Sequence, residues 1–288
     1  MDAPLKQEWT LEIGPKKNIF DINFRELWHY RDLLLLMVRR DFIAFYKQTI
    51  LGPVWFFVQP MLTTLTYLII FGKVADLPTD ETPKLIFYLA GVTCWTYINE
   101  SLTKTSDTFI TNANIFGKVY FPRLIIPLSI ILSNLIRLGI QMILFLLIWG
   151  YYLVFDSARV HPNGALFILP LLVLLMALLS LALGIIFSSL TTKYRDLRFL
   201  LTFGVQLLMF ATPVVYPLSL AEHKSPFFKW LIIANPYTAI VETFRYAFLG
   251  SGTFSWGMIG YSTASTLIIL AIGVIIFNRI ERSFMDVV

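Results

Sequence analysis

Six long apolar stretches dominate the pattern of hydrophobic and polar residues along the chain. A helix needs about 20 apolar residues to cross the hydrocarbon core of a bilayer, and each stretch is near or above that length. Lipid offers no partner for unpaired backbone groups, so each stretch is expected to be a helix. We therefore predict an all-α integral membrane fold with six transmembrane helices. The stretches are residues 51–72, 85–103, 124–155, 165–190, 199–216 and 256–277.

The chain before the first stretch is amphipathic. Asn23 can cap a helix that begins at Phe24, and Glu26 occupies the capping-box position three residues later. Apolar and basic side chains gather on different faces, which predicts a helix in the membrane interface over residues 24–50; a soluble amphipathic helix packed on another surface is the alternative. The apolar face holds Phe24, Leu27, Trp28, Leu35, Val38, Phe42, Phe45 and Tyr46, and the basic face Arg25, His29, Arg40 and Lys47. Residues 1–23 form a short polar arm, and residues 51–288 form the six-span domain.

The segment between the fifth and sixth stretches carries two apolar pieces that are too short to span a bilayer. They are residues 227–234 and 237–249, separated by Asn235–Pro236 and closed by Gly250. Even the longer piece reaches only about 20 Å as a helix, against a hydrocarbon core of about 30 Å. We predict two short re-entrant outer helices, which are tolerated where they pack on protein or line a water-filled path.

The composition excludes a soluble globular protein. Hydrophobic residues make up 57% of the chain and charged residues 14%, whereas soluble domains average about 45–50% and about 25%. Most of the 23 lysines and arginines fall in segments on the same side as both termini. The side richer in basic residues faces the cytoplasm, so both termini are predicted to be cytoplasmic.

Two charges and several aromatic rings inside the stretches are candidates for function, because polar groups are costly in lipid. Glu100 lies near the inner end of the second stretch and Arg137 lies within the third. We hypothesise that they form an ion pair that moves during the working cycle; separate hydration of each charge is the alternative. Aromatic side chains can also line a path and stack on the apolar faces of sugar rings. The candidates are Trp55, Phe56, Tyr88, Trp95 and Tyr97.

Motifs for catalysis or for cofactor binding are absent from the sequence. Neither Gly72–Lys73 nor Gly117–Lys118 is followed by Ser or Thr, so there is no nucleotide-binding loop. One cysteine, Cys94, and three scattered histidines make no HExxH or CxxC motif. We expect no catalytic residue, no metal site and no cofactor in this chain.

Several short motifs resemble those of permease subunits of bacterial type 2 ABC transporters that export polysaccharides, a family that includes exporters of O-antigen, capsule and teichoic acid. They are ELWHYRDLL at 26–34, RDF at 40–42, YKQTILGPVW at 46–55, QP at 59–60, YFPR at 120–123, KYRDL at 193–197, TPVVYP at 212–217, NPYT at 235–238 and FRYAFLG at 244–250. Each motif is weak alone, but together they occur in the expected order from Arg25 to the end of the chain.

The resemblance implies a homodimer that works with two copies of a separate ABC ATPase, which binds the ATP and magnesium. The N-terminal helix and the loops 104–123 and 191–198 would face that ATPase, and the short outer helices would form the outer gate of a channel. The implied coupling residues are Arg39, Arg40, Lys104, Asp107, Lys118, Lys193, Tyr194, Arg195 and Asp196, and the implied gate residues are Pro217, Asn235, Pro236, Glu242 and Arg245. The family often has an acidic residue where Arg137 stands, and this departure puts any carried-over role for the intramembrane charges in doubt.

The expected function is therefore export of a lipid-linked polysaccharide, O-antigen first among the candidates, across the bacterial inner membrane during lipopolysaccharide biosynthesis. A permease of the same family for teichoic acid, capsule, a drug or a lipid is the first alternative. An integral-membrane acyl- or glycosyltransferase and a passive channel are alternatives of other classes. A transferase needs histidine or paired carboxylates near one membrane face, and the outer acidic residues are scattered along the sequence. No nucleic-acid partner is expected.

Overall fold

The computed structural model describes residues 24–47, 49–116, 118–156, 159–194, 196–224 and 226–283. Within these ranges the regular elements are all helices, which confirms the all-α prediction for the described part of the chain. The predicted arm 1–23, the Asn23 cap and the coupling candidate Arg195 lie outside the described residues.

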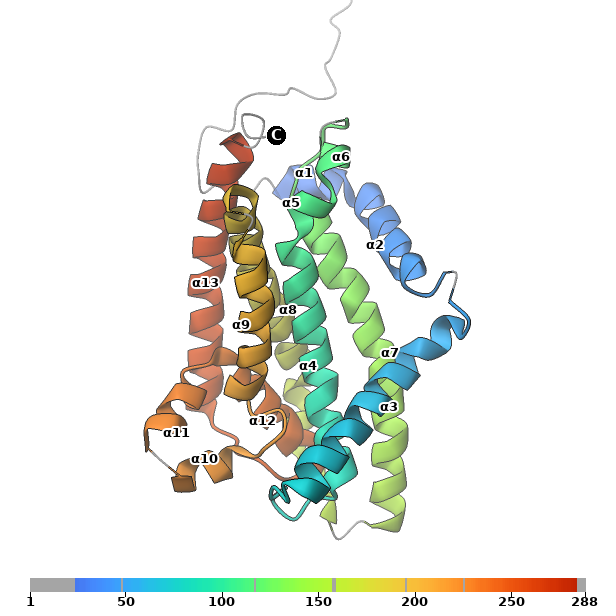
Figure 1. Cartoon of the computed structure of the whole chain (residues 1–288), viewed down its shortest axis with the longest axis vertical. Helices are drawn as coiled ribbons and strands as arrows, with labels where there is room; N and C mark the ends of the chain where they lie inside the picture. The colour runs from blue at the N-terminus through green and yellow to red at the C-terminus, as the bar shows by residue number, and fades with distance from the viewer. Residues whose placement is uncertain are drawn as a thin grey trace, which may run out of the picture.

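The helices follow one another along the chain with short connections (Figure 1). Their bounds are α1 Phe24–His29, α2 Arg31–Tyr46, η1 Gly52–Val54, α3 Trp55–Tyr67, η2 Leu68–Val74, α4 Lys84–Ser106, α5 Thr108–Thr111, α6 Ala113–Phe116, α7 Ile125–Phe155, η4 Gly164–Ile168, α8 Leu169–Lys193, α9 Leu197–Ala211, α10 Leu218–Lys224, α11 Pro226–Ile233, α12 Pro236–Leu249 and α13 Trp256–Ser283.

Each of the six predicted stretches contains a helix, although α9 ends at Ala211 and leaves residues 212–216 of the fifth stretch outside it. Four of these helices are both long and apolar enough to cross a membrane. These four are Gly52–Val74, Ile125–Phe155, Gly164–Lys193 and Trp256–Ile280. The helix in the second stretch, α4, has 23 residues but is more polar. The helix in the fifth stretch, α9, has 15 residues and reaches about 22 Å.

The polarity of α4 has a structural cause, because this helix occupies the centre of the bundle. Most of its residues are buried, and it packs against α3, α7, α8 and α12. At Gly91 a Cβ atom would lie 2.4 Å from the carbonyl oxygen of Val214. The segment after α9 therefore approaches α4 as closely as a glycine allows. Since α4 contacts protein rather than lipid over most of its surface, it need not be uniformly apolar.

The N-terminal amphipathic segment forms two helices rather than one. The chain turns at Tyr30 between α1 and α2, and α2 ends at Tyr46, so the predicted single helix is divided. Helix α2 packs against α7 and buries Met37 and Val38. Of the predicted apolar face, Trp28 and Leu35 remain exposed, at 71% and 62%. Part of the predicted apolar face therefore packs on the protein, through Val38, Phe42 and Phe45, and part of it remains exposed.

The segment between α9 and α13 follows the predicted pattern closely and adds one helix. The two predicted pieces are α11 and α12, and α10 precedes them. Asn235 caps α12 by accepting a hydrogen bond from the Tyr237 amide at 3.1 Å, with Pro236 in the first turn. Gly250 ends α12 at a φ of 75°, a conformation in which glycine is favoured.

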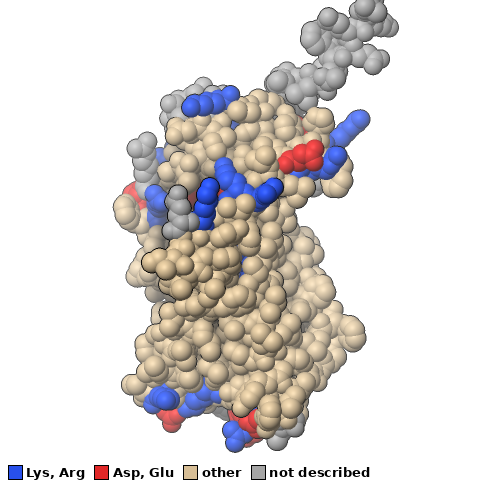
Figure 2. All heavy atoms as spheres, turned by 90° about the vertical axis from the view of Figure 1, so that its right-hand side faces the viewer, with Lys and Arg blue, Asp and Glu red and all other residues tan. Residues whose placement is uncertain are grey.

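The two ends of the bundle differ in their elements. One end carries α1, α5, α6 and the C-terminal turn of α13; the other carries α10, α11 and α12 (Figure 1). We call them the inner and the outer end, following the predicted orientation. Figure 2 shows charged side chains gathered toward both ends, with a wide uncharged belt between them. That distribution is typical of a protein that crosses a bilayer.

Candidate functional site

A charged cluster near the inner end joins α4 and α7. Arg137 Nη1 lies 2.6 Å from Glu100 Oε2, and Lys104 Nζ lies 2.5 Å from the same oxygen. The Arg137 side chain is 8% exposed and that of Glu100 is 19% exposed. Two cations, the buried Arg137 and the 42% exposed Lys104, therefore share a single carboxylate. The structure contains the pair that the sequence suggested, and adds Lys104 to it.

The two paired residues meet although they lie at different distances from the ends of their helices. Arg137 is about 18 Å along α7 from Ile125, whereas Glu100 is about 9 Å from Ser106 at the end of α4. Helices α5 and α6 lie beyond the end of α4, and the chain returns from there into α7 (Figure 1). This excursion lets α7 begin farther out, so that the two side chains reach the same level.

Helix α2 contributes to the cluster from the side. Arg137 Nη2 donates to the Asp41 carbonyl oxygen at 3.3 Å, and the guanidinium lies 4.2 Å from the centre of the Phe45 ring. Ser129 of α7 donates to the Asp41 carboxylate at 3.4 Å. The amphipathic helix is thus attached to the bundle through the same arginine that binds Glu100. The sequence placed Phe45 on the apolar face of this helix but did not signal its contact with Arg137, and it did not signal Asp41.

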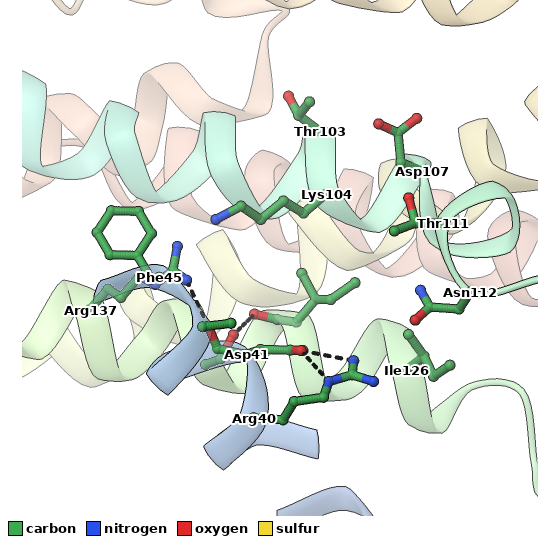
Figure 3. Close-up of a pocket in the computed structure, with 13 residues that line it drawn as sticks. Arg40, Asp41, Phe45, Thr103, Lys104, Asp107, Thr111, Asn112, Ile126 and Arg137 are labelled. Atoms are coloured by element: carbon green, nitrogen blue, oxygen red, sulfur yellow. Dashed lines mark hydrogen bonds and ion pairs between the residues drawn. The ribbon is translucent and has the colours of Figure 1, made fainter. Parts of the chain in front are cut away.

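A cavity of about 390 Å³ opens beside this cluster, between α2 and the inner parts of α4, α5 and α7 (Figure 3). Arg40, Lys104 and Arg137 supply its cations, and Asp41 and Asp107 supply its carboxylates. Arg40 forms an ion pair with Asp41 at 2.8 Å. The remaining lining residues are Ala44, Phe45, Thr103, Thr111, Asn112, Ile126, Ile130 and Ser133.

The segment after α4 is bonded to the end of α8 and to the start of α9 at the inner end. Asp107 Oδ2 lies 2.9 Å from Arg198 Nη2 at the start of α9, and Thr191 Oγ1 donates to the Ser106 carbonyl at 3.2 Å. Arg198 belongs to a predicted coupling loop but was not among the predicted coupling residues. The sequence did not indicate its pairing because Asp107 is 91 residues away.

The predicted coupling residues divide into two groups. Arg40, Lys104 and Asp107 line the inner cavity, where the fold brings them together. The other described coupling residues are exposed at the surface and do not belong to the cavity lining; these are Arg39, Lys118, Lys193, Tyr194 and Asp196.

The predicted gate residues Glu242 and Arg245 form a buried anchor at the outer end. Arg245 Nη1 donates to the carbonyls of Pro213 and Tyr216 at 2.6 and 3.3 Å, and Nη2 donates to that of Val214. Its guanidinium also lies 3.4 Å from the Glu242 carboxylate, and both side chains are at most 1% exposed. Arg245 therefore satisfies the backbone of the non-helical segment that follows α9.

The other gate residues hold the ends of the outer helices. Asn235 donates from Nδ2 to Thr212 Oγ1 at 2.8 Å and to the Ala211 carbonyl at 3.2 Å, which connects the start of α12 to the end of α9. Pro217 is buried, and its carbonyl accepts from the Leu220 amide at 3.2 Å in the first turn of α10.

The five candidate channel aromatics lie in different surroundings. Tyr88, Trp95 and Tyr97 of α4 are buried within this single chain. Phe56 is also buried and stacks on Phe42 and Phe45, at centroid distances of 5.3 and 4.9 Å. Trp55, at the start of α3, is half-buried. In this arrangement the rings pack the fold, and Trp55 retains the largest accessible surface of the set.

Comparisons with known proteins agree on one family. The model of the family described as ABC-2 type transporter matches residues 32–249. An O-antigen export system permease protein RfbA of Klebsiella pneumoniae is 27% identical over 256 residues, covering 89% of this chain and 95% of that protein. The Myxococcus xanthus protein of the same name is 28% identical over 78% of this chain and 83% of its own length. The polysialic acid transport protein KpsM of Escherichia coli is 23% identical over 82% and 88%. Because the family model covers most of the chain, and the described residues form helices of which four are long and apolar enough to span a membrane, the chain belongs to the ABC-2 type transporter family.

Proposed function

We propose that this chain is the transmembrane subunit of an ATP-driven exporter that moves a lipid-linked polysaccharide, an O-antigen, out of the cytoplasm across the bacterial inner membrane. The observation that carries the proposal is the match to proteins named as O-antigen export permeases, which covers 89% of this chain and 95% of a relative's length. The absence of a nucleotide-binding loop from the sequence supports a division of labour with a separate ATPase.

The assembly that follows contains two copies of this chain and two copies of an ABC ATPase. Moving a long hydrated glycan requires a path wider than one bundle encloses, and an interface between two copies provides it. The ATPase docks at the inner end, where exposed Arg39, Lys118 and Lys193 are available to acidic partner residues.

The membrane topology in this proposal has six passes with both termini in the cytoplasm. Helices α4 and α9 supply the two passes beyond the four that meet the length and apolarity of a span. Burial of α4 among other helices allows its polar residues at membrane depth. The position of α1 and of the end of α13 at the same end of the bundle supports an even number of passes.

The coupling path runs from α2 into the bundle. A push by the ATPase on α2 reaches Arg137 through Asp41 and Phe45, and reaches α4 through Glu100. The Asp107–Arg198 pair moves α9 together with the loop after α4. At the outer end α10, α11 and α12 form a re-entrant gate that Arg245 anchors, and Trp55 is the aromatic residue proposed to contact sugar.

Deleting the gene tests the function directly. In the deletion strain, lipid-linked glycan should accumulate inside the cell while surface glycan disappears, and the wild-type gene should restore export. A copy of the partner ATPase that binds but does not hydrolyse ATP is the matched control and should reproduce the deletion. Normal surface glycan in the deletion strain would refute the proposal.

A second cargo has one specific observation in its favour. The Escherichia coli relative is named for polysialic acid transport, so an acidic capsular polymer is the competing substrate class. Analysis of which surface polymer is lost in the deletion strain separates the two. Turnover of any acyl or glycosyl donor by the purified chain would instead favour a transferase.

A further inference from the structure

The inner cavity carries an excess of positive charge. Arg40 is paired with Asp41 and Asp107 with Arg198, so each of these pairs is neutral. Arg137 and Lys104 share the single carboxylate of Glu100. Among these seven side chains one positive charge is therefore left without a counter-ion. The Arg137 side chain is 8% exposed, and beside such a shielded group the excess charge attracts an anion more strongly than it would at a fully exposed surface.

One donor at the cavity also lacks a hydrogen-bond partner. Arg137 lines the cavity, its side chain is 8% exposed, and its Nε has no partner among the described residues. A buried N–H group without a partner costs free energy that a bound acceptor recovers. The guanidinium as a whole presents a planar donor set that suits the oxygens of a phosphate group.

The shape and position of the cavity favour the head group of a lipid. Its volume of about 390 Å³ lies within the range of about 300–1,000 Å³ that is usual for small-ligand sites. Ala44, Phe45, Ile126 and Ile130 give it an apolar wall next to the cations (Figure 3). The cavity lies under α2, whose exposed Leu35, with Trp28 of the preceding helix, is suited to the membrane interface. Basic pockets between helices on the cytoplasmic side bind anionic lipid head groups.

We propose that the cavity between α2, α4 and α7 binds the phosphate group of an inner-leaflet lipid, with Arg137 and Lys104 as the phosphate ligands. The assignment to the inner leaflet rests on the orientation in the proposed function. The phosphate replaces part of the contact that Glu100 makes with the two cations. Arg137 also contacts Asp41 and Phe45 of α2, so lipid binding at Arg137 is coupled to the position of α2.

Binding to the purified full chain in neutral detergent tests the site without any export assay, so its failure and a failure of the proposed function are separable. The probes are dioctanoyl-phosphatidylglycerol, farnesyl diphosphate and inorganic phosphate; dioctanoyl-phosphatidylcholine and farnesol serve as matched controls without net charge. Tighter binding of phosphatidylglycerol identifies an ambient phospholipid as occupant, and tighter binding of the diphosphate identifies an isoprenoid-linked lipid. Either result supports the proposal. Equal affinity for inorganic phosphate would overturn the lipid assignment, and binding no stronger than that of the controls would overturn the site.

Two substitutions that are expected to change lipid affinity in opposite directions give the sharper test. Arg137→Gln should lower the affinity for the better lipid probe about tenfold, which is about 1.4 kcal/mol. Glu100→Gln should raise it severalfold, because both cations are then released to the phosphate. Ala44→Phe should abolish binding by filling the cavity while it leaves all charges in place. A purely structural role for the cluster predicts weaker binding in both charge variants, and that result would refute the proposal.

The matched control is Arg279→Gln, which removes an exposed arginine at the inner end of α13, outside the cavity. It should leave lipid affinity unchanged, and a loss equal to that of Arg137→Gln would show that general surface charge is responsible. If Arg137→Gln does not yield folded protein, Arg137→Lys replaces it. The lysine keeps the charge but loses the guanidinium fork, and affinity should fall between wild type and the level of Ala44→Phe.

Discussion

Arg137 of α7 and Glu100 of α4 form an ion pair 2.6 Å long near the inner end of the bundle, and this pair is the point at which three helices meet. The third helix is α2, which reaches the same arginine through Asp41 and Phe45. Lys104 shares the Glu100 carboxylate at 2.5 Å. A movement of α2 therefore cannot leave α4 and α7 unchanged unless this cluster rearranges.

The inner cluster has two cations and one carboxylate, so removing the carboxylate should destabilise the fold more than removing one cation. Glu100→Gln leaves two cations without an anion and should destabilise the fold by about 3 kcal/mol. Arg137→Gln leaves Glu100 paired with the partly exposed Lys104 and should cost about 1 kcal/mol. Denaturant unfolding of the purified chain in detergent measures both, with Arg279→Gln as a neutral control. A larger loss in Arg137→Gln than in Glu100→Gln would contradict this account.

Substitutions in the outer anchor of Arg245 and Glu242 should destabilise the fold more than substitutions in the inner cluster. Arg245→Ala removes the donor for three backbone carbonyls and leaves Glu242 buried without its cation. We expect a loss of more than about 3 kcal/mol and a low yield of monodisperse protein. Glu242→Gln should cost less, because Arg245 keeps its carbonyl acceptors. The ranking is measured by size-exclusion chromatography and thermal unfolding, and equal losses would show that the carbonyl contacts are unimportant.

Two glycines inside helices offer a matched test of close packing. A Cβ at Gly91 would lie 2.4 Å from the Val214 oxygen and 2.8 Å from Arg245 Nη2, whereas one at Gly139 of α7 would meet nothing within 4 Å. Gly91→Ala should therefore cost about 1–3 kcal/mol by forcing α4 away from the segment after α9. Gly139→Ala should be neutral or stabilising by up to about 1 kcal/mol. The unfolding midpoints of the two variants measure this difference. An unchanged midpoint in Gly91→Ala would refute the tight contact.

The pair between Asp107 and Arg198 predicts a functional defect without a large loss of stability. Arg198 is 51% exposed, so breaking the pair should cost at most about 1 kcal/mol. In the proposed exporter, Arg198→Gln should lower the glycan exported per ATP hydrolysed, because α9 no longer follows the loop after α4. Export and hydrolysis are measured in the same proteoliposomes.

The control for that experiment is the exposed pair of Asp156 and Arg159 at the other end of α7. Asp156→Asn removes a similar surface interaction and should leave the ratio of export to hydrolysis unchanged. An unchanged ratio in Arg198→Gln would remove this pair from the coupling path.

The candidate site was only partly accessible from the sequence. Glu100 and Arg137 were noticeable because charge inside an apolar stretch is rare and costly. Lys104 lies four residues after Glu100, so their contact follows from helical spacing. Asp41 and Arg198 join the site through hydrogen bonds that span 88 to 96 residues. No local pattern carries information about contacts of that range.

The sequence by itself determined where the long helices lie, and it marked the Asn235–Pro236 break before α12 and the Gly250 terminus of α12. These features depend on apolar length and on local backbone chemistry, which act within a few residues. Only the tertiary structure decided that α4 is central, that α2 buries Met37 and Val38, and that Arg245 holds the segment after α9. Each of these depends on which helix faces which. In a chain that is apolar on nearly every face, hydrophobicity does not distinguish a surface that meets lipid from one that meets protein.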